Sequence, residues 1–184
     1  MERSLFGDAI AGILPSDVQD MSEVREIPDN QEVFAHPNTD QSIIIEILEF
    51  VQETDEQALR THFEDLASSN DAASSSDSCI LGTEVLDRQQ LAMKQCSCAY
   101  WLMGQQRVSK FNESAKNDVN LHMVLYRLPQ FTTDILVTFN DPVNVNPESS
   151  SHQAMATATV PWTVDDFRAL VNSLTIVDTG LFGQ

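Results

Sequence analysis

The stretch VNLHMVLYRLPQFTTDILVTFN, residues 119–140, decides the fold of this chain. Apolar side chains fall at every second position in residues 119–125 and again in residues 135–139, which is typical of β-strands with one face against a core. Pro129 separates the two runs, and proline interrupts a strand because it has no N–H to donate. The stretch therefore predicts two neighbouring antiparallel strands.

Four further strands are expected before this pair in the chain, in residues 32–35, 41–50, 80–86 and 99–111. The second of them contains three consecutive isoleucines, whose β-branching favours a strand over a helix. Residues 112–118 are expected to close the hairpin that leads into residue 119. Before the first of the four strands, Pro28 is expected at the second position of a turn that continues through Asp29 and Asn30.

Two helices complete the predicted elements, in residues 54–66 and 163–174. Each begins at a threonine that suits the N-cap, Thr54 and Thr163, and apolar residues recur at helical spacing in both. We expect one α+β domain over residues 1–184, a twisted and mainly antiparallel sheet flanked by a helix on each face. Two polar stretches rich in small residues, 68–78 and 141–159, are expected to be mobile loops.

The charge of the chain narrows the class of partner. The 184 residues include 28 acidic and 10 basic ones, for a net charge of -18, and residues 1–66 alone hold 16 acidic and 3 basic residues. A chain of this charge repels phosphate backbones, so direct nucleic-acid binding is not expected, and a partner with a basic surface is favoured. The alternative is that the charge serves only solubility.

The cysteine count and the hydropathy pattern bear on the compartment. The chain has three cysteines, no signal-peptide pattern and no apolar run near the roughly 20 residues that cross a bilayer. We therefore expect a reducing compartment and no membrane partner.

Motifs for catalysis or cofactor binding are missing from the sequence. No glycine-rich phosphate loop is present, and the four histidines are scattered without zinc-ligand spacing. Cys96 and Cys98 form C-x-C, for which partly buried free thiols are favoured over a redox motif. Tyr100, Trp101 and Met103 are expected to be core residues. We expect no catalytic residue, no metal and no cofactor.

Six segments in chain order resemble one family: LFGDAIAGILP (5–15), REIPDNQEVF (25–34), DQSIIIEILEF (40–50), HFEDLA (62–67), YRLPQFTTDILVTFN (126–140) and LTIVDTGLFG (174–183). The chain is similar to the Ran guanine nucleotide release factors, the Mog family. The resemblance implies a fold shared with the PsbP proteins of photosystem II, in which residues 5–15 form the opening strand. It also implies that the chain binds the GTPase Ran, releases its guanine nucleotide, and acts in nuclear transport. We expect a monomer, located in the nucleus and the cytoplasm.

The resemblance implies a Ran-binding site in two parts. The first is the turn and strand with Asp29, Asn30, Gln31, Glu32 and Phe34. Asp29 and Glu32 would set carboxylates against basic groups of Ran, Asn30 and Gln31 would donate hydrogen bonds, and Phe34 would anchor the root. From the residues alone, the alternative is a plain turn followed by a solvated glutamate.

The second part of the implied site is the pair Glu46 and Glu49. Residues three apart in a regular strand face opposite sides, so these two can meet one partner only near an end, a bulge or a turn.

Two other functions are weighed against Ran binding. One is a ligand-binding or scaffold module that shares the fold without exchange activity. The other is an acid–base enzyme that uses His62, Glu64 or Asp65, residues for which a solvated helix end is the simpler interpretation.

Overall fold

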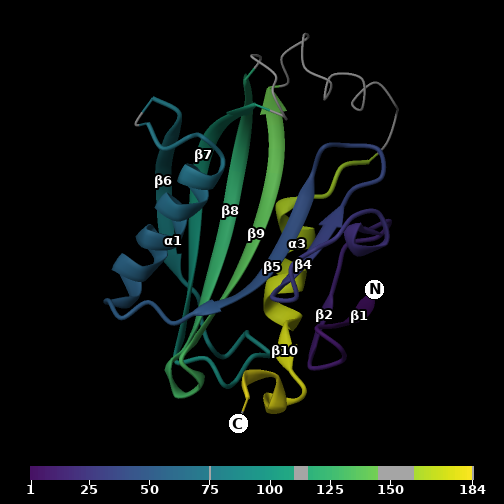
Figure 1. Cartoon of the computed structure of the whole chain (residues 1–184), viewed down its shortest axis with the longest axis vertical. Helices are drawn as coiled ribbons and strands as arrows, with labels where there is room; N and C mark the ends of the chain where they lie inside the picture. The colour runs from purple at the N-terminus through teal and green to yellow at the C-terminus, as the bar shows by residue number, and fades with distance from the viewer. Residues whose placement is uncertain (75, 110–115, 145–159, 184) are drawn as a thin grey trace.

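A seven-stranded antiparallel sheet forms the body of the protein (Figure 1). The computed structural model describes residues 1–74, 76–109, 116–144 and 160–183. In spatial order the strands are β3 (Gln19–Asp20), β4 (Gln31–Ala35), β5 (Ser42–Glu49), β9 (Thr133–Asn144), β8 (Lys116–Leu128), β7 (Cys98–Ser109) and β6 (Ser78–Val85).

The two strands expected from residues 119–140 lie at the centre of this sheet. β8 pairs antiparallel with β9 from Leu128↔Thr133 outward. The short 3-10 helix Pro129–Phe131 joins them, and Thr132 completes the reversal with a left-handed φ of 48°. The prediction of neighbouring antiparallel strands is confirmed. Residues 116–118, expected to be part of a turn, extend β8 instead, because they pair with β7. Residues 112–115 lie outside the described residues.

The two predicted helices are also confirmed. Helix α1 (Asp55–Ser69) is capped by Thr54, whose hydroxyl accepts from the Gln57 N–H at 3.4 Å. Helix α3 (Val164–Ser173) starts with a capping box, in which Thr163 and Asp166 each accept a backbone N–H of the other.

Both predicted loop ranges are too long, because the neighbouring helix and strands extend into them. Helix α1 continues through Ser68 and Ser69, and β6 starts at Ser78. Residues 141–144 extend β9. Residues 145–159 lie outside the described part of the chain, so the prediction of a mobile loop there stays a prediction.

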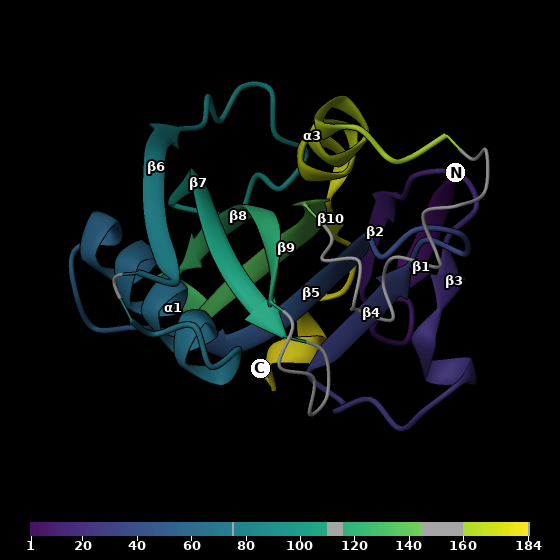
Figure 2. The ribbon, with the colours of Figure 1, turned by 90° about the horizontal axis from the view of Figure 1, so that it is seen from above.

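Each face of the sheet is covered by one helix (Figure 2). Side chains of β8 alternate between the two: Leu121 and Met123 pack in the cluster with α1, whereas Val124 and Tyr126 pack in the cluster with α3. The central strands are thus buried on both faces, which gives the near-continuous apolar run of residues 123–126. The predicted α+β arrangement is confirmed in this respect.

A second, three-stranded sheet corrects the expected opening strand. Residues 5–15 do not form one strand, because Phe6, Gly7 and Asp8 take left-handed φ values of 49°, 62° and 73° and reverse the chain. The result is a hairpin of β1 (Glu2–Leu5) and β2 (Ile10–Ile13), to which β10 (Thr175–Ile176) adds. At Gly12, a Cβ would lie 3.0 Å from a methyl of Leu174, so glycine lets β2 approach the end of α3. Among the described residues, no helix is long and apolar enough to cross a membrane.

Candidate functional site

The turn before β4 presents two exposed polar residues, Asp29 and Asn30. The Gln31 N–H donates to the Pro28 carbonyl at 2.9 Å, so Pro28 is the first residue of the turn and not the second as predicted. Asp29 and Asn30 occupy its two central positions, where short polar residues fit well. The tip of the turn therefore presents the carboxylate of Asp29 to solvent.

Asn30 fixes the turn to β5. Its side-chain nitrogen donates to the Ile47 carbonyl at 3.1 Å, and its own carbonyl accepts from the Ile47 N–H at 2.9 Å. These bonds continue the pairing of β4 with β5 beyond Gln31↔Glu46. The turn thus lies beside the second half of β5, the segment that contains Glu46 and Glu49.

Glu32 turns inward to the amino-terminal hairpin. Its Oε1 accepts the Phe6 N–H at 2.6 Å, and the side chain is half-buried. Phe6 opens the left-handed turn between β1 and β2, so this bond satisfies a backbone donor where the hairpin reverses. The carboxylate of Glu32 holds the hairpin in place, and it is not the freely solvated group of the plain-turn alternative.

Phe34 anchors the strand, as the sequence suggested. Only 1% of its surface is exposed, and it packs in the cluster under α3 with Ile43, its neighbour across the strands. The guanidinium of Arg3 lies 5.6 Å from the centre of its ring. Phe34 therefore supports the surface from below and does not itself reach solvent.

Gln31 and Glu46 form a polar pair on the opposite face, toward α1. The Gln31 side-chain amide donates to Glu46 Oε1 at 2.7 Å across the two strands. Partial burial raises the pKa of the Glu46 carboxyl above its ordinary value, while the bond from Gln31 and the nearby His62 act in the other direction. Glu46 is thus a partly desolvated acid with one donor already in place.

Glu46 and Glu49 line the same groove between β5 and α1. The groove has a volume of about 320 Å³, and Leu48, Leu66 and Leu136 contribute its apolar part. Glu49 is the exposed last residue of β5, and a strand end is where two positions three apart can serve one surface. Asp65 of α1 adds a third carboxylate to the rim.

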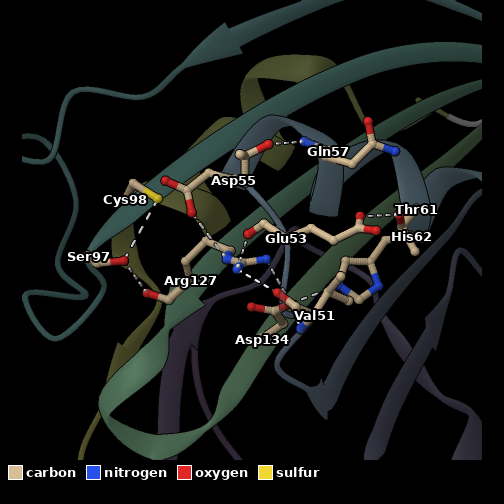
Figure 3. Close-up of polar contacts among 11 residues, drawn as sticks. Val51, Glu53, Asp55, Gln57, Thr61, His62, Ser97, Cys98, Arg127 and Asp134 are labelled. Atoms are coloured by element: carbon tan, nitrogen blue, oxygen red, sulfur yellow. Dashed lines mark hydrogen bonds and ion pairs between the residues drawn. The ribbon is translucent and has the colours of Figure 1, made fainter.

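A buried ionic network below this groove was missed by the sequence analysis (Figure 3). His62 is 6% exposed, and its Nε2 lies 3.0 Å from Asp134 Oδ2, which also accepts from Arg127 Nη1 at 3.3 Å. Arg127 and Asp134 face each other across β8 and β9. His62 is therefore not part of a solvated helix end, which corrects that interpretation.

The network holds the connection from β5 to α1. Arg127 Nη2 donates to the carbonyls of Val51 and Glu53, at 2.8 and 3.3 Å, and Asp134 Oδ2 accepts the Val51 N–H at 3.1 Å. The Arg127 guanidinium also lies 3.8 Å from the centre of the Phe50 ring. These contacts set the position of α1 relative to β5, and so they set the shape of the groove.

One sequence signal does point to the burial of His62. It stands four residues after Ala58 and three after Leu59, on the same apolar stripe of the helix as Phe63. Arg127 and Asp134 gave a weaker signal, because charged residues beside a turn are usually solvated.

The residues of the acid–base alternative do not all converge. His62 and Asp65 both line the groove toward β5, but the Nε2 of His62 already pairs with Asp134. Glu64 lines a different cleft toward β6, so it lies apart from the other two.

The cysteines and aromatic residues take structural positions. Cys96 is buried and Cys98 is partly buried, and both are free thiols, as expected. Burial and the neighbouring Asp55 raise the pKa of Cys98 to about 12, which keeps it protonated. Trp101 is a core residue, Tyr100 is partly buried, and Met103 is exposed, contrary to expectation. In the described part of the chain, no group of three or more His, Cys, Asp or Glu residues is placed to hold a metal.

The fold and the site together define a class: an α+β protein with an acidic turn beside an acidic groove. Comparison with known proteins identifies the family. The family described as Ran-interacting Mog1 protein matches residues 3–142. The chain is 53% identical over 184 residues to the Ran guanine nucleotide release factor of Danio rerio, covering 100% of both chains. The chain therefore belongs to the Ran-interacting Mog1 family.

Two yeast comparisons agree with this assignment. The nuclear import protein MOG1 of Saccharomyces cerevisiae is 27% identical over 194 residues, covering 98% of this chain and 84% of the yeast protein. The solved structure of the Saccharomyces cerevisiae Ran-binding protein Mog1p has a TM-score of 0.71 at 24% identity, covering 99% and 97% of the two chains. That structure shares the fold. The kinship with PsbP proteins stays a prediction.

Proposed function

We propose that this protein binds the GTPase Ran and promotes release of its guanine nucleotide by binding alone, without covalent catalysis. One observation carries the proposal: the turn with Asp29 is fixed by Asn30 against the strand whose Glu46 and Glu49 line an acidic groove. Family membership supplies the identity of the partner, because a relative of 53% identity is named a Ran guanine nucleotide release factor.

The contacts suggest different roles for the residues of the site. Asp29 has an exposed carboxylate, and we assign it the direct contact with basic groups of Ran. Glu46 and Glu49 accept a basic or hydrogen-bonding group in the groove, with Gln31 orienting Glu46. Glu32 and Phe34 are positioning residues, since one holds the β1–β2 turn and the other is buried.

Nucleotide release follows from linkage. A protein that binds nucleotide-free Ran more tightly than loaded Ran must weaken nucleotide binding by the same factor. A coupling free energy of ~4 kcal/mol would weaken it by roughly a thousandfold. Carboxylates against the basic and metal-binding groups around the phosphates would supply such a preference, because they compete with the same positive charges.

The test is the rate of labelled GDP and GTP release from Ran. We expect Asp29→Ala and Glu49→Lys to slow release and to weaken binding, and Glu49→Lys to flatten the salt dependence of binding as well. Glu2→Ala, a change at an exposed acid on β1, is the matched control and should behave as the unchanged protein. Full activity in both site variants would remove this surface from the mechanism. Ran binding without release would support the scaffold alternative.

The place of action in the cell follows as part of the same proposal. A yeast relative is named a nuclear import protein. We infer a role in nuclear import, with the protein as a monomer in both nucleus and cytoplasm. Nucleic acid is not a partner in this proposal, because a net charge of -18 opposes contact with phosphates.

A further inference from the structure

The edge of the seven-stranded sheet that β6 forms is a second surface, separate from the acidic turn and groove. β6 ends the strand order, and within the described residues it pairs with β7 alone. Figures 1 and 2 both show β6 at the outer edge of the sheet with α1 beside it. Its sequence SCILGTEV has no proline or lysine, so of the features that commonly protect an edge from strand addition it has one charge, Glu84, and the bulge at Leu81.

The pairing with β7 shows which main-chain groups point outward. The Arg107 N–H donates to the Asp77 carbonyl at one end of β6, and the Leu86 N–H donates to the Ala99 carbonyl at the other. Along a strand of an antiparallel pair, residues whose main-chain groups bond to the partner strand alternate with residues whose main-chain groups point away from it. This alternation, followed inward from Asp77 and from Leu86, directs the N–H and C=O groups of Ile80, Thr83 and Val85 away from β7. Ile80 lies before the bulge at Leu81, and the other two lie after it.

A cleft lined by both apolar and polar residues runs beside this edge, between β6 and α1. It has a volume of about 610 Å³, within the range of about 300–1,000 Å³ that is usual for ligand sites. Phe63, Ala67 and Ile80 contribute its apolar wall. The ring of Phe63 packs closely on β7 because that strand has Gly104 there. A Cβ at this position would lie 2.7 Å from the ring.

We propose that β6 and this cleft bind an extended peptide segment of a second partner protein, which adds as a strand to β6 and places one bulky apolar side chain in the cleft. The outward main-chain groups select an extended backbone, and the cleft selects the side chain. Leu81 and Val85, 65% and 63% exposed, offer further apolar contact along the edge. Strand addition beside a helix-lined groove is an established way for proteins to bind peptides.

Charge complementarity favours a segment with basic residues next to the apolar one. Glu64 lines the cleft, and Glu84 is exposed on β6 itself. Arg60, the basic residue of the cleft, already pairs with Glu56 at 3.8 Å. Because the whole chain has a net charge of -18, its negative electrostatic potential would attract lysine or arginine in the partner segment.

The experiment uses the full chain and a set of short fluorescent peptides. The peptides alternate threonine with Leu, Val or Phe and carry lysine at both ends. Binding is measured by fluorescence anisotropy and mapped by amide chemical shifts, and we expect saturable binding with shifts in β6 and α1. Methylating the peptide nitrogens on one alternate set of residues should abolish binding, while methylating the other set should not, because only one edge of the peptide faces β6.

Two pairs of variants locate the peptide. Thr83→Pro removes an outward N–H without a bond to β7 and should weaken binding by at least about tenfold, whereas Thr83→Ala should have little effect. Ser68→Trp fills the cleft and should also weaken binding, whereas Ser69→Trp, which lies in the groove toward β5, should not. Dispersed amide spectra show that each variant is folded, and Thr83→Pro should leave nucleotide release from Ran unchanged.

Three results would overturn the proposal. One is that no peptide of the set binds saturably. Another is that binding persists at full strength in both Thr83→Pro and Ser68→Trp. The third is that sedimentation shows a dimer that Thr83→Pro dissociates, since the edge would then be occupied by a second copy of this chain.

Discussion

Replacing Asp134 with asparagine tests whether the buried ionic network holds the fold. Asp134 has no exposed surface, and its Oδ2 accepts from His62, Arg127 and the Val51 N–H. Asparagine keeps the size and an oxygen for the Val51 N–H, so the main change is the loss of one negative charge. Among the described residues, Arg127, 1% exposed, then retains only Asp55 as an ion-pair partner, at 3.4 Å.

The expected cost follows from this geometry. Breaking a buried ion pair by removing one partner costs about 3–5 kcal/mol, because it leaves an uncompensated buried charge. Asp55 is 43% exposed and offsets part of the loss, so we expect Asp134→Asn to cost about 3 kcal/mol, the lower end of that range. For a domain of this size, such a loss is a large fraction of the total stability.

Urea unfolding followed by circular dichroism measures this cost. A second protein, Arg127→Gln with Asp134→Asn, removes both charges and keeps amide groups near the Val51 and Glu53 backbone, so it should be more stable than Asp134→Asn alone, since no unpaired buried charge remains. The matched control is Asp165→Asn, a change at an exposed acid in the first turn of α3. A cost below about 1 kcal/mol for Asp134→Asn, or a double variant worse than the single one, would refute the reasoning.

Two further predictions concern Glu46 and the cap of α3. Burial raises the pKa of Glu46 above its ordinary 4.5, so its stabilising contribution is full below pH 4.5 and is lost as the pH rises through the raised pKa. Glu46→Gln should remove this pH-dependent loss of stability. Urea unfolding of both proteins at several pH values measures the difference, and the same dependence of the unfolding free energy on pH in both proteins would contradict the prediction. Thr163→Ala removes the capping box and should cost about 1 kcal/mol of unfolding free energy in the same assay, and no loss would show that packing alone fixes the helix start.

Local patterns of the sequence were sufficient for most elements of the fold. The period of residues 119–140 predicted the central hairpin, and Thr54 and Thr163 marked both helix starts, because strand alternation and capping are short-range effects. The reversal at Phe6–Asp8 was missed. Two of its three left-handed residues are not glycine, so the turn depends on contacts such as the bond from Glu32 to Phe6.

The resemblance supplied the residues of the proposed site, but the sequence did not supply their geometry. The sequence alone did not indicate which of the acids are free: Asp29 is exposed, whereas Glu32 and Glu46 already accept hydrogen bonds from Phe6 and Gln31. Those partners lie 26 and 15 residues away along the chain, and tertiary folding alone brings them together.

The two bonds between Asn30 and Ile47 hold the acidic turn in one shape in the absence of a partner. Ordering a loop residue on binding costs about 1–2 kcal/mol of backbone entropy, and here much of that cost is met when the protein folds. Asn30→Ala, which loses the side-chain bond, is therefore expected to weaken Ran binding mainly through faster dissociation, even though the charge of the surface is unchanged. The turn is thus a rigid, preorganised element. For such an element, a change of shape is expected to alter the dissociation rate more than a change in long-range electrostatic attraction does.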